Sequence, residues 1–291
     1  MIRKKPMLAQ NVGDYSRIKD SDWPLYVQPK LDGVRCLIQY EPKTIRSEFY
    51  AGKVKAYSRT GKEWKNIDHI LAELKPFFQK YPNVILDGEL YNHDFKDDFE
   101  SIISMVRKTK PTDEDKLKSA NNVQFHCYDI IDDKLLFNQR INFIIESLML
   151  LGNSIHTVDT RMVYNTEEVE AKHEEFLELG YEGSILRQNK PYECKRSYTL
   201  MKVKDFYDTE ATITSWVEGK GKRIGTIGKF MAVDADGNEF GMPVMDKFDY
   251  LQKNFEEMKT WVGKIATFTY FERTKAGSYR HPLFKCIRNY E

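Results

Sequence analysis

Apolar residues recur three or four positions apart in several segments, which is the spacing of one face of an α-helix. The clearest of these segments is 67–81, and Pro82-Asn83 ends it. The same pattern predicts further helices over 95–107, 139–151, 166–179 and 246–261. Thr166, followed by two glutamates, is the expected N-cap of its helix. Residues 108–122 are polar and dense in charge, so we expect a mobile loop there.

Shorter runs, either alternating or wholly apolar, predict strands between these helices. They cover 35–40, 53–59, 84–86, 123–131, 182–187 and 200–204. The run 84–86 ends at Asp87-Gly88-Glu89, and on the last strand Lys202 and Lys204 would face the same side. Because strands and helices do not alternate regularly, the pattern favours an α+β domain of antiparallel sheets and helices.

After residue 207 the pattern changes to strands separated by glycine-containing turns. These strands are expected at 211–218, 228–233, 239–243 and 264–271. Some five strands and one helix in about eighty residues are typical of a small Greek-key β-barrel, the OB-fold. We therefore expect two domains, 1–207 and 208–291.

Composition narrows the class of protein. The chain has 291 residues, of which 41% are hydrophobic, enough for two cores. Apolar runs such as 148–151 are too short to cross a bilayer and no apolar signal core follows the N-terminus, so we expect a cytoplasmic protein without a membrane partner. The four cysteines are scattered without a CxxC pair, which argues against zinc and favours buried, reduced thiols. A net charge of +1 gives no general basic excess, so only local clusters could bind nucleic acid.

Candidate chemistry is densest in Lys30-Leu31-Asp32-Gly33-Val34-Arg35. A lysine amine can attack phosphorus once it is deprotonated, and nearby cations with partial burial favour that neutral form. Asp32 would instead favour the charged ammonium if its carboxylate lay close to Lys30. Gly33 permits a tight backbone turn under a ligand. The alternative is a surface Lys-Asp pair in a turn.

Other segments supply groups that suit a nucleotide, and each has a structural alternative. Glu89 can hold a ribose hydroxyl or a hard metal ion, unless Asp-Gly marks an ordinary hairpin. Lys202 and Lys204 can neutralise phosphates, unless they are protective lysines of an edge strand. Tyr128 can stack on a purine, although a core tyrosine is as common. Glu182 places an acid at the start of a strand.

In their order, these motifs resemble those of the ATP-dependent DNA ligases, within the nucleotidyltransferase superfamily. The resemblance covers nearly the whole chain and is greatest to the compact bacteriophage and viral type. It implies an N-terminal nucleotidyltransferase (adenylation) domain followed by an OB-fold barrel. Lys30 would become linked to AMP, and the implied catalytic residues are Lys30, Asp32, Arg35, Glu89, Glu182, Lys202 and Lys204.

The resemblance also implies binding roles. The nucleotide would be bound by Gln28, Lys30, Arg35, Glu89, Tyr128, Glu182, Lys202, Lys204 and Arg280, the last of these orienting the pyrophosphate. DNA would be bound by Arg59, which addresses the 5′-phosphate of a nick, and by Arg196, Lys220, Lys222 and Arg223. Glu89 and Glu182 would hold the metal. The spacer around 42–52, before Arg59, is longer than the family pattern.

The implied reaction is the sealing of nicks in duplex DNA by a monomer, with ATP and with Mg²⁺, or Mn²⁺ in its place, in DNA repair, replication or recombination. The compartment would be the cytoplasm of a bacterium or of a phage-infected cell. Two alternatives stay open. One is an RNA ligase or a GTP-using capping enzyme, and the other is a nucleic-acid-binding module without catalysis.

Overall fold

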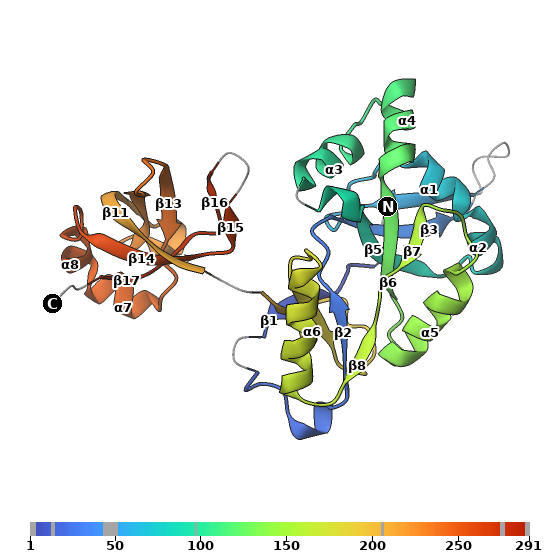
Figure 1. The fold of residues 1–291 in the computed structure, drawn as a ribbon, viewed down its shortest axis with the longest axis horizontal. Helices are drawn as coiled ribbons and strands as arrows, with labels where there is room; N and C mark the ends of the chain where they lie inside the picture. Colours follow the sequence, from blue (N-terminus) through green and yellow to red (C-terminus); the bar gives the residue numbers. More distant parts are fainter. Residues whose placement is uncertain are drawn as a thin grey trace. The chain divides into compact units, whose positions relative to one another are not determined.

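The structure, a computed structural model, describes residues 4–12, 15–42, 52–96, 98–204, 207–273 and 277–288. The chain divides into two compact units, Met1–Val203 and Lys204–Glu291 (Figure 1). Each unit has its own apolar core. The division lies a few residues before the boundary expected at residue 207, and most of the spacer 42–52 is outside the described residues.

Two five-stranded sheets form the first unit. The first sheet contains, in order, β4 (Lys53–Tyr57), β3 (Val34–Glu41), β5 (Ile85–Tyr91), β6 (Gln124–Ile130) and β7 (Ile155–Thr157). The second contains β1 (Leu8–Asn11), β10 (Arg196–Val203), β9 (Ser184–Arg187), β2 (Leu25–Pro29) and β8 (Arg161–Val163). Only the outer pairs β6–β7 and β1–β10 are parallel among these described strands. The antiparallel α+β architecture expected from the pattern is therefore confirmed.

Helices cover the outer faces of both sheets. The first sheet packs on α1 (Asp68–Glu73), α2 (Lys75–Lys80), α3 (Phe99–Val106) and α5 (Phe137–Leu148), whose apolar residues join Leu86 and Leu90 of β5 in one core. The second sheet is covered by α6 (Thr166–Glu178) through Val169 and Phe176 (Figure 1). A smaller apolar cluster, with Leu37 and Ile85 from one sheet and Leu200 from the other, joins the inner faces. This arrangement leaves inward-facing polar residues of both sheets close together.

The Asp87-Gly88-Glu89 motif lies in the middle of β5 and not at a strand end or in a hairpin turn. The apolar run predicts a strand that ends at residue 86, but β5 continues to Tyr91 because it pairs with β3 on one side and β6 on the other. Side chains alternate along a strand, so Asp87 and Glu89 share the inner face while Leu86 and Leu90 enter the core.

The charge-dense segment 108–122 is not a loop, and this expectation was wrong. It contains α4 (Asp113–Asn122), which begins with a capping box. The Thr112 hydroxyl accepts from the Asp115 amide at 3.2 Å, and the Asp115 carboxylate accepts from the Thr112 amide at 3.0 Å. Three acids in the first turn add a favourable interaction with the helix dipole.

Other helix boundaries differ by a few residues. The predicted helix 67–81 is two helices that meet at Leu74, and α3 begins at Phe99, after a 3₁₀ turn (η2, His93–Phe95). Helix α6 is capped by Asn165, whose side chain accepts from the Glu168 amide at 2.8 Å, and not by Thr166. A further 3₁₀ turn, η1, covers Asp20–Asp22.

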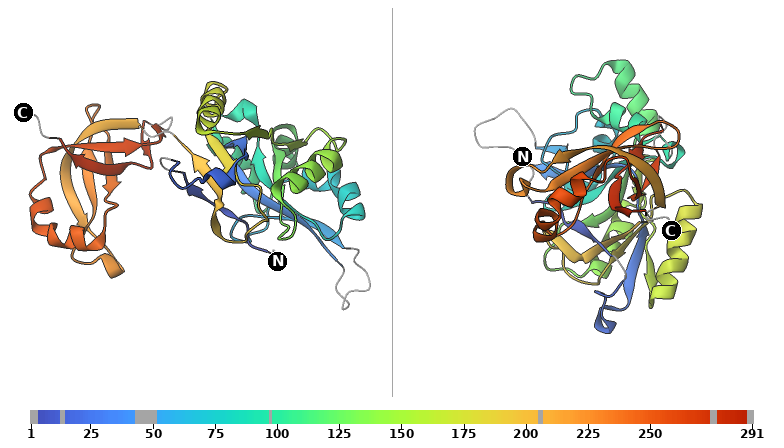
Figure 2. Two further views of the ribbon diagram at one scale, coloured as in Figure 1. Left: turned by 90° about the horizontal axis from the view of Figure 1, so that it is seen from below. Right: turned by 90° about the vertical axis from the view of Figure 1, so that its left-hand side faces the viewer.

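The second unit is a five-stranded antiparallel sheet with the order β13-β12-β11-β14-β17 (Figure 2). The strands are β11 (Tyr207–Glu218), β12 (Ile227–Val233), β13 (Glu239–Pro243), β14 (Ile265–Tyr270) and β17 (Leu283–Ile287). Its outer strands β13 and β17 also approach each other, so the sheet closes into a small barrel around Phe230 and Phe268. The predicted barrel is therefore confirmed, although its single helix is two, α7 (Phe248–Lys253) and α8 (Phe255–Lys259). A 3₁₀ turn, η3 (Gly221–Arg223), and a hairpin of β15 (Glu272–Arg273) and β16 (Tyr279–Arg280) complete the unit.

The four cysteines are free thiols, but only two of them are buried. Cys36 and Cys127 lie in the core of the first unit, whereas Cys194 and Cys286 are exposed. The expectation of four buried thiols was therefore half wrong, because those two lie in a loop and on the outer face of a barrel strand. Among the described residues, no helix combines the length and apolarity that a membrane span requires.

Candidate active site

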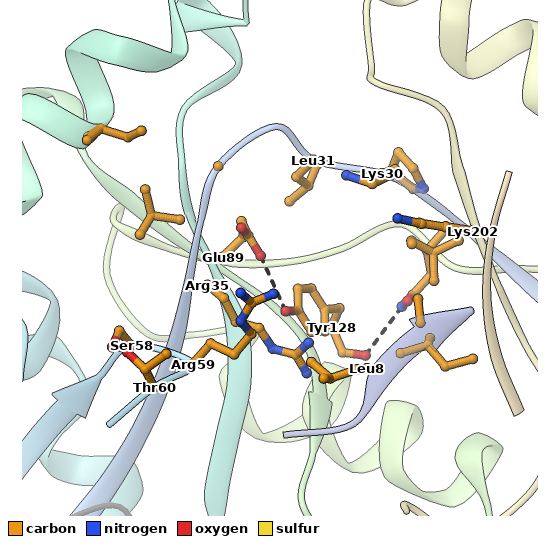
Figure 3. Close-up of a pocket in the computed structure, with 18 of the residues that line it drawn as sticks. Leu8, Lys30, Leu31, Arg35, Ser58, Arg59, Thr60, Glu89, Tyr128 and Lys202 are labelled. Atoms are coloured by element: carbon orange, nitrogen blue, oxygen red, sulfur yellow. Dashed lines mark hydrogen bonds between the residues drawn. The ribbon is translucent and has the colours of Figure 1, made fainter. Parts of the chain in front are cut away.

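A cavity of about 730 Å³ opens in the first unit, between the inner faces of the two sheets. Of the described residues that line it, eight are cationic and one, Glu89, is acidic. The cations are Lys30, Arg35, Arg59, Lys62, Arg107, Arg187, Arg196 and Lys202. Figure 3 shows Lys30 and Lys202 on one side, Ser58, Arg59 and Thr60 on the other, and Glu89 with Tyr128 between them. Such a cavity favours a ligand that carries several negative charges.

Lys30 follows β2 and is fixed by its backbone. Its amide donates to the Gly183 carbonyl at 2.8 Å, and its own carbonyl accepts from the Glu182 amide at 3.1 Å. The Lys30 side chain is 20% exposed, and its ammonium forms an ion pair with the carboxylate of Glu182. Gly183 is needed here because it has a φ of +141°, and a Cβ would lie 2.4 Å from the Val203 carbonyl oxygen. Two motifs 152 residues apart thus form one lysine–carboxylate pair.

Gly33 allows the loop after Lys30 to pass close to β5. A Cβ on residue 33 would lie 2.6 Å from the Glu89 Cγ and 2.6 Å from the Leu90 carbonyl oxygen. The glycine therefore sets the distance between the lysine loop and the central acidic strand. Asp32, in the same loop, is not among the residues that line the cavity.

Glu89 and Tyr128 form the floor between the two cationic walls. The Tyr128 hydroxyl donates to the Glu89 carboxylate at 3.3 Å. Burial raises the pKa of the Glu89 carboxyl to about 7, against the opposing charges of Arg35 and Lys30. Burial also holds the pKa of the Tyr128 hydroxyl well above its usual value, so it remains a donor. A cation that entered the cavity would favour the ionised form of Glu89.

Arg35 lies in the cavity wall, but its guanidinium is committed to a neighbour. Its Nε and Nη2 donate to the two oxygens of Asp87 at 2.9 and 2.6 Å. Burial opposes this charge, but the Asp87 carboxylate outweighs it and holds the pKa of Arg35 well above its usual value. Tyr192, from the loop after β9, donates to the same carboxylate at 2.6 Å. The Arg35–Asp87 pair joins two neighbouring strands of one sheet, and Tyr192 connects it to the other sheet. Arg35 therefore orders the wall and has little freedom to follow a ligand.

Arg187 lines the cavity although it is not among the residues predicted for the site. It lies on β9, and its Nη1 donates to Asp129 of β6 at 2.6 Å, while its Nε donates to the Gln28 Oε1 at 2.6 Å. Arg140 of α5 binds the same aspartate from the other side. A signal was present: Arg140 falls on the apolar face of its helix with Phe137, which is typical of a buried ion pair.

Lys202 and Arg196 of β10 extend the cationic wall beside Lys30. Burial, Lys30 and Arg196 together lower the pKa of the Lys202 amine. The Arg196 guanidinium donates to the Ala9 carbonyl at 2.5 Å. Strand β10 ends at Val203, so Lys204 does not share a strand face with Lys202 as expected. Lys204 belongs to the second unit, where its amine lies 4.0 Å from the centroid of the Phe271 ring.

The remaining predicted residues also lie in the second unit. Arg280 is on β16, with its guanidinium 5.9 Å from the centroid of the Phe271 ring. Lys220 and Lys222 are exposed in the turn between β11 and β12. Arg223, in the same turn, donates to the Val244 carbonyl at 3.0 Å. These residues form no part of the cavity in the first unit.

The two predicted metal ligands fit a cation only in part. Within the described residues, no group of three or more His, Cys, Asp or Glu side chains could hold a metal ion. Glu89 is buried with its pKa near 7, and Glu182 is paired with Lys30. These carboxylates therefore fit a metal that arrives with a nucleotide and takes its other ligands from phosphate oxygens.

Fold and cavity together define a nucleotidyltransferase domain with a cavity lysine, followed by an OB-like barrel. Residues 6–204 match the family model of the ATP-dependent DNA ligase domain, and residues 218–288 match that of the DNA ligase OB-like domain. The first match covers more than half of the chain, so the chain belongs to the ATP-dependent DNA ligase family.

Relatives support this placement. A DNA ligase of African swine fever virus (isolate Tick/South Africa/Pretoriuskop Pr4/1996) is 30% identical over 213 residues, which are 69% of this chain and 46% of that protein. A DNA ligase of Haemophilus influenzae is 25% identical over 217 residues, which are 72% of this chain and 73% of that protein. A solved structure of a Lig E DNA ligase, from work on DNA binding with a minimal scaffold, has a TM-score of 0.74 at 25% identity. The match covers 99% of this chain and 100% of that chain. The chain thus spans less than half the length of the viral relative.

Proposed function

We propose that this chain seals nicks in duplex DNA with ATP, through a Lys30–AMP and then an adenylylated DNA intermediate. One observation carries the proposal: the Lys30 amine is paired with Glu182 in a cavity lined, among the described residues, by eight cations and one acid. The DNA ligase domain match across 6–204 supports DNA joining as the use of that amine.

The first step would form a P–N bond at Lys30. The amine attacks the α-phosphorus of ATP, the bond from that phosphorus to the pyrophosphate oxygen breaks, and pyrophosphate leaves with the electron pair. The attacking ammonium must first lose a proton, and Glu182, already paired with it, is placed to accept one. Lys202 and Arg196 would neutralise phosphate charge, and the charge of Lys202 beside Lys30 would also favour the loss of a proton from the Lys30 amine.

Glu89 and Tyr128 would meet the nucleoside. Tyr128 offers a ring beside the base, and Glu89 can accept from a ribose hydroxyl or, with Glu182, hold Mg²⁺. When bound, the metal would supply charge neutralisation at the phosphate oxygens. Asp32 and Arg35 would act indirectly, by shaping the lysine loop and the wall.

The later steps would use the other wall and the second unit. Arg59 would hold the 5′-phosphate of the nick while AMP is transferred to it, and the 3′-hydroxyl would then displace AMP. Arg196 would lie near this nick. Lys220, Lys222 and Arg223 would contact the DNA backbone without reading its sequence, and Lys204 and Arg280 would address nucleotide phosphates.

Incubation with α-labelled ATP and Mg²⁺, followed by a denaturing gel, tests the first step. The wild-type chain should carry label and Lys30→Ala should not, while Lys172→Ala, on the surface of α6, should label like wild type. Equal labelling of Lys30→Ala would exclude Lys30 as the nucleophile. Addition of nicked DNA or nicked RNA to the labelled protein then distinguishes a DNA ligase from an RNA ligase. Labelling by GTP alone would indicate a capping enzyme. DNA binding without any labelling would indicate a binding module.

A further inference from the structure

The amide of Gln28 forms part of the cavity wall and has a fixed orientation. Gln28 lies on β2, 1% exposed. Its Oε1 accepts from the Arg187 Nε at 2.6 Å, and its Nε2 donates to the Thr160 hydroxyl oxygen at 2.8 Å and to the Tyr128 carbonyl at 3.3 Å. Three neighbours therefore surround one amide.

Two of these contacts agree on which end of the amide is oxygen, and together they hold that orientation. The Arg187 guanidinium can only donate, so the atom that faces it must be an acceptor. The Thr160 hydroxyl uses its proton on the Val158 carbonyl at 3.0 Å, so its oxygen must accept from Gln28. A flipped amide would place donor against donor at Arg187 and acceptor against acceptor at Thr160.

Counting hydrogen bonds shows what Gln28 can still offer a ligand. A glutamine amide has two N–H donors and two oxygen lone pairs. Both donors and one lone pair are occupied by Thr160, Tyr128 and Arg187. Only one lone pair of Oε1 remains, so any polar group that meets Gln28 from the cavity must be a donor.

We propose that Arg187 is a positioning residue that holds Gln28 as an acceptor, so that the cavity selects a purine with a 6-amino group over 6-oxo purines. This inference rests on the proposed transfer of a nucleotide to Lys30. Adenine can donate from its amino group to the remaining lone pair, whereas guanine and hypoxanthine would set a carbonyl oxygen against Oε1. The unpaired, buried acceptors would then oppose binding.

Arg140 provides a matched control for Arg187, since both arginines bind Asp129. Arg140 alone reaches both Asp129 oxygens, with Nε to Oδ1 at 2.7 Å and Nη2 to Oδ2 at 3.2 Å. Replacing Arg187 therefore leaves the carboxylate paired. Arg140 does not line the cavity and does not contact Gln28. Comparing the two separates the loss of a buried ion pair from the loss of Gln28 orientation.

The test measures label transfer to the full chain from α-labelled ATP, GTP and ITP over a range of concentrations. In Arg187→Met the amide can flip, so the preference for ATP should fall at least about tenfold, mainly through a higher KM for ATP. Thr160→Val, which removes the acceptor for Nε2, should change the preference in the same direction. Arg140→Met should change labelling by all three nucleotides by one common factor.

An unchanged ATP preference in a folded Arg187→Met would overturn the inference. Thermal unfolding shows whether each variant is folded. If Arg187→Met does not fold, the nucleotide preference of Thr160→Val tests the inference in its place. An equal loss of preference in Arg140→Met would also overturn it, because general disorder of the wall would then explain the result. Absence of label from every nucleotide in the wild-type chain would instead refute the proposed function.

Discussion

In the proposed reaction, Lys30 would depend on Glu182 in two opposed ways. The carboxylate stabilises the ammonium form of Lys30 with which it pairs, yet it would also accept the proton that must leave before the amine attacks. Both groups are largely buried, at 20% and 6% exposed, so water is a poor substitute for either role. Glu182, distant in sequence, forms this pair across the lysine loop, where its own amide also donates to the Lys30 carbonyl.

Glu182→Gln keeps the shape of the side chain and removes its charge. We expect the rate of Lys30–AMP formation to fall by about a hundredfold, the usual contribution of a positioned acid or base. Rapid-quench labelling with α-labelled ATP measures that rate directly. Glu178→Gln, an exposed residue four positions earlier, is the control and should label at the wild-type rate. A wild-type rate in Glu182→Gln would remove Glu182 from the proton transfer.

Some residues of the site could be predicted from the sequence and others could not. Lys30, Glu89 and Lys202 stand in short local motifs, and the structure brings all three to one cavity. Arg187 could not be found in this way, because its partner Asp129 is 58 positions away. A local motif records the residue types, whereas a buried ion pair depends on which strands become neighbours.

His126 on β6 provides a pH dependence at the residue scale. Burial, His156 and His93 lower the pKa of His126 to about 3. The unfolded chain, with an ordinary histidine pKa near 6.5, therefore binds the proton first, and the folded state loses stability as the pH falls below that value. Between pH 6.5 and 4.5, the free energy of unfolding should fall by roughly 1 kcal/mol per pH unit more in wild type than in His126→Gln. Urea unfolding at several pH values measures this difference, and parallel pH curves would contradict it.

At the scale of elements, periodicity predicted most of the strands and helices. Strand β13 agrees with the predicted range at both ends, and β12 differs by one residue. The failures have particular causes. Helix α4 is polar nearly throughout and is stabilised by its capping box and by contacts such as the Asn66 amide on the Asp115 carbonyl at 3.2 Å, neither of which is visible in apolar spacing. The predicted strand ends before β5 does because Asp87 and Glu89 interrupt the apolar run, although both lie within the paired strand.

Gly33→Ala tests how closely the lysine loop must approach β5. The added methyl would lie 2.6 Å from both the Glu89 Cγ and the Leu90 carbonyl oxygen, so the loop or the strand must move. We expect a loss of about 1–3 kcal/mol in the free energy of unfolding and a larger relative loss of Lys30–AMP formation. Chemical denaturation and the labelling assay measure these two effects.

Gly241→Ala is the matched control for that substitution. The atoms nearest to its new methyl would be those of the flexible Lys229 side chain at 3.2 Å and the Met231 sulfur at 3.4 Å, both able to move aside. Labelling and stability should stay close to wild type. If Gly33→Ala behaved like Gly241→Ala, close approach would not be the reason for a glycine at residue 33.

At the scale of the whole molecule, the residues assigned to the proposed reaction are distributed over two units. The cavity with Lys30 is complete within the first unit, whereas Arg280 and the exposed Lys220 and Lys222 belong to the second. Each unit has a separate apolar core, so each should fold without the other. The proposed reaction therefore requires residues that no single unit contains.

A chain truncated after Tyr207 tests this division. The fragment keeps Lys30, Glu89, Glu182 and Lys202 with their core, so it should unfold cooperatively and still bind ATP. It lacks Arg280 and the basic turn, so nick sealing should fall at least about a hundredfold, because DNA and the reacting phosphates are no longer held in place. A gel assay on nicked duplex DNA measures sealing, and equilibrium unfolding shows whether the fragment is folded. Sealing by a folded fragment at the full-length rate would show that the second unit is dispensable, and Arg280, Lys220 and Lys222 would then have no role in the reaction.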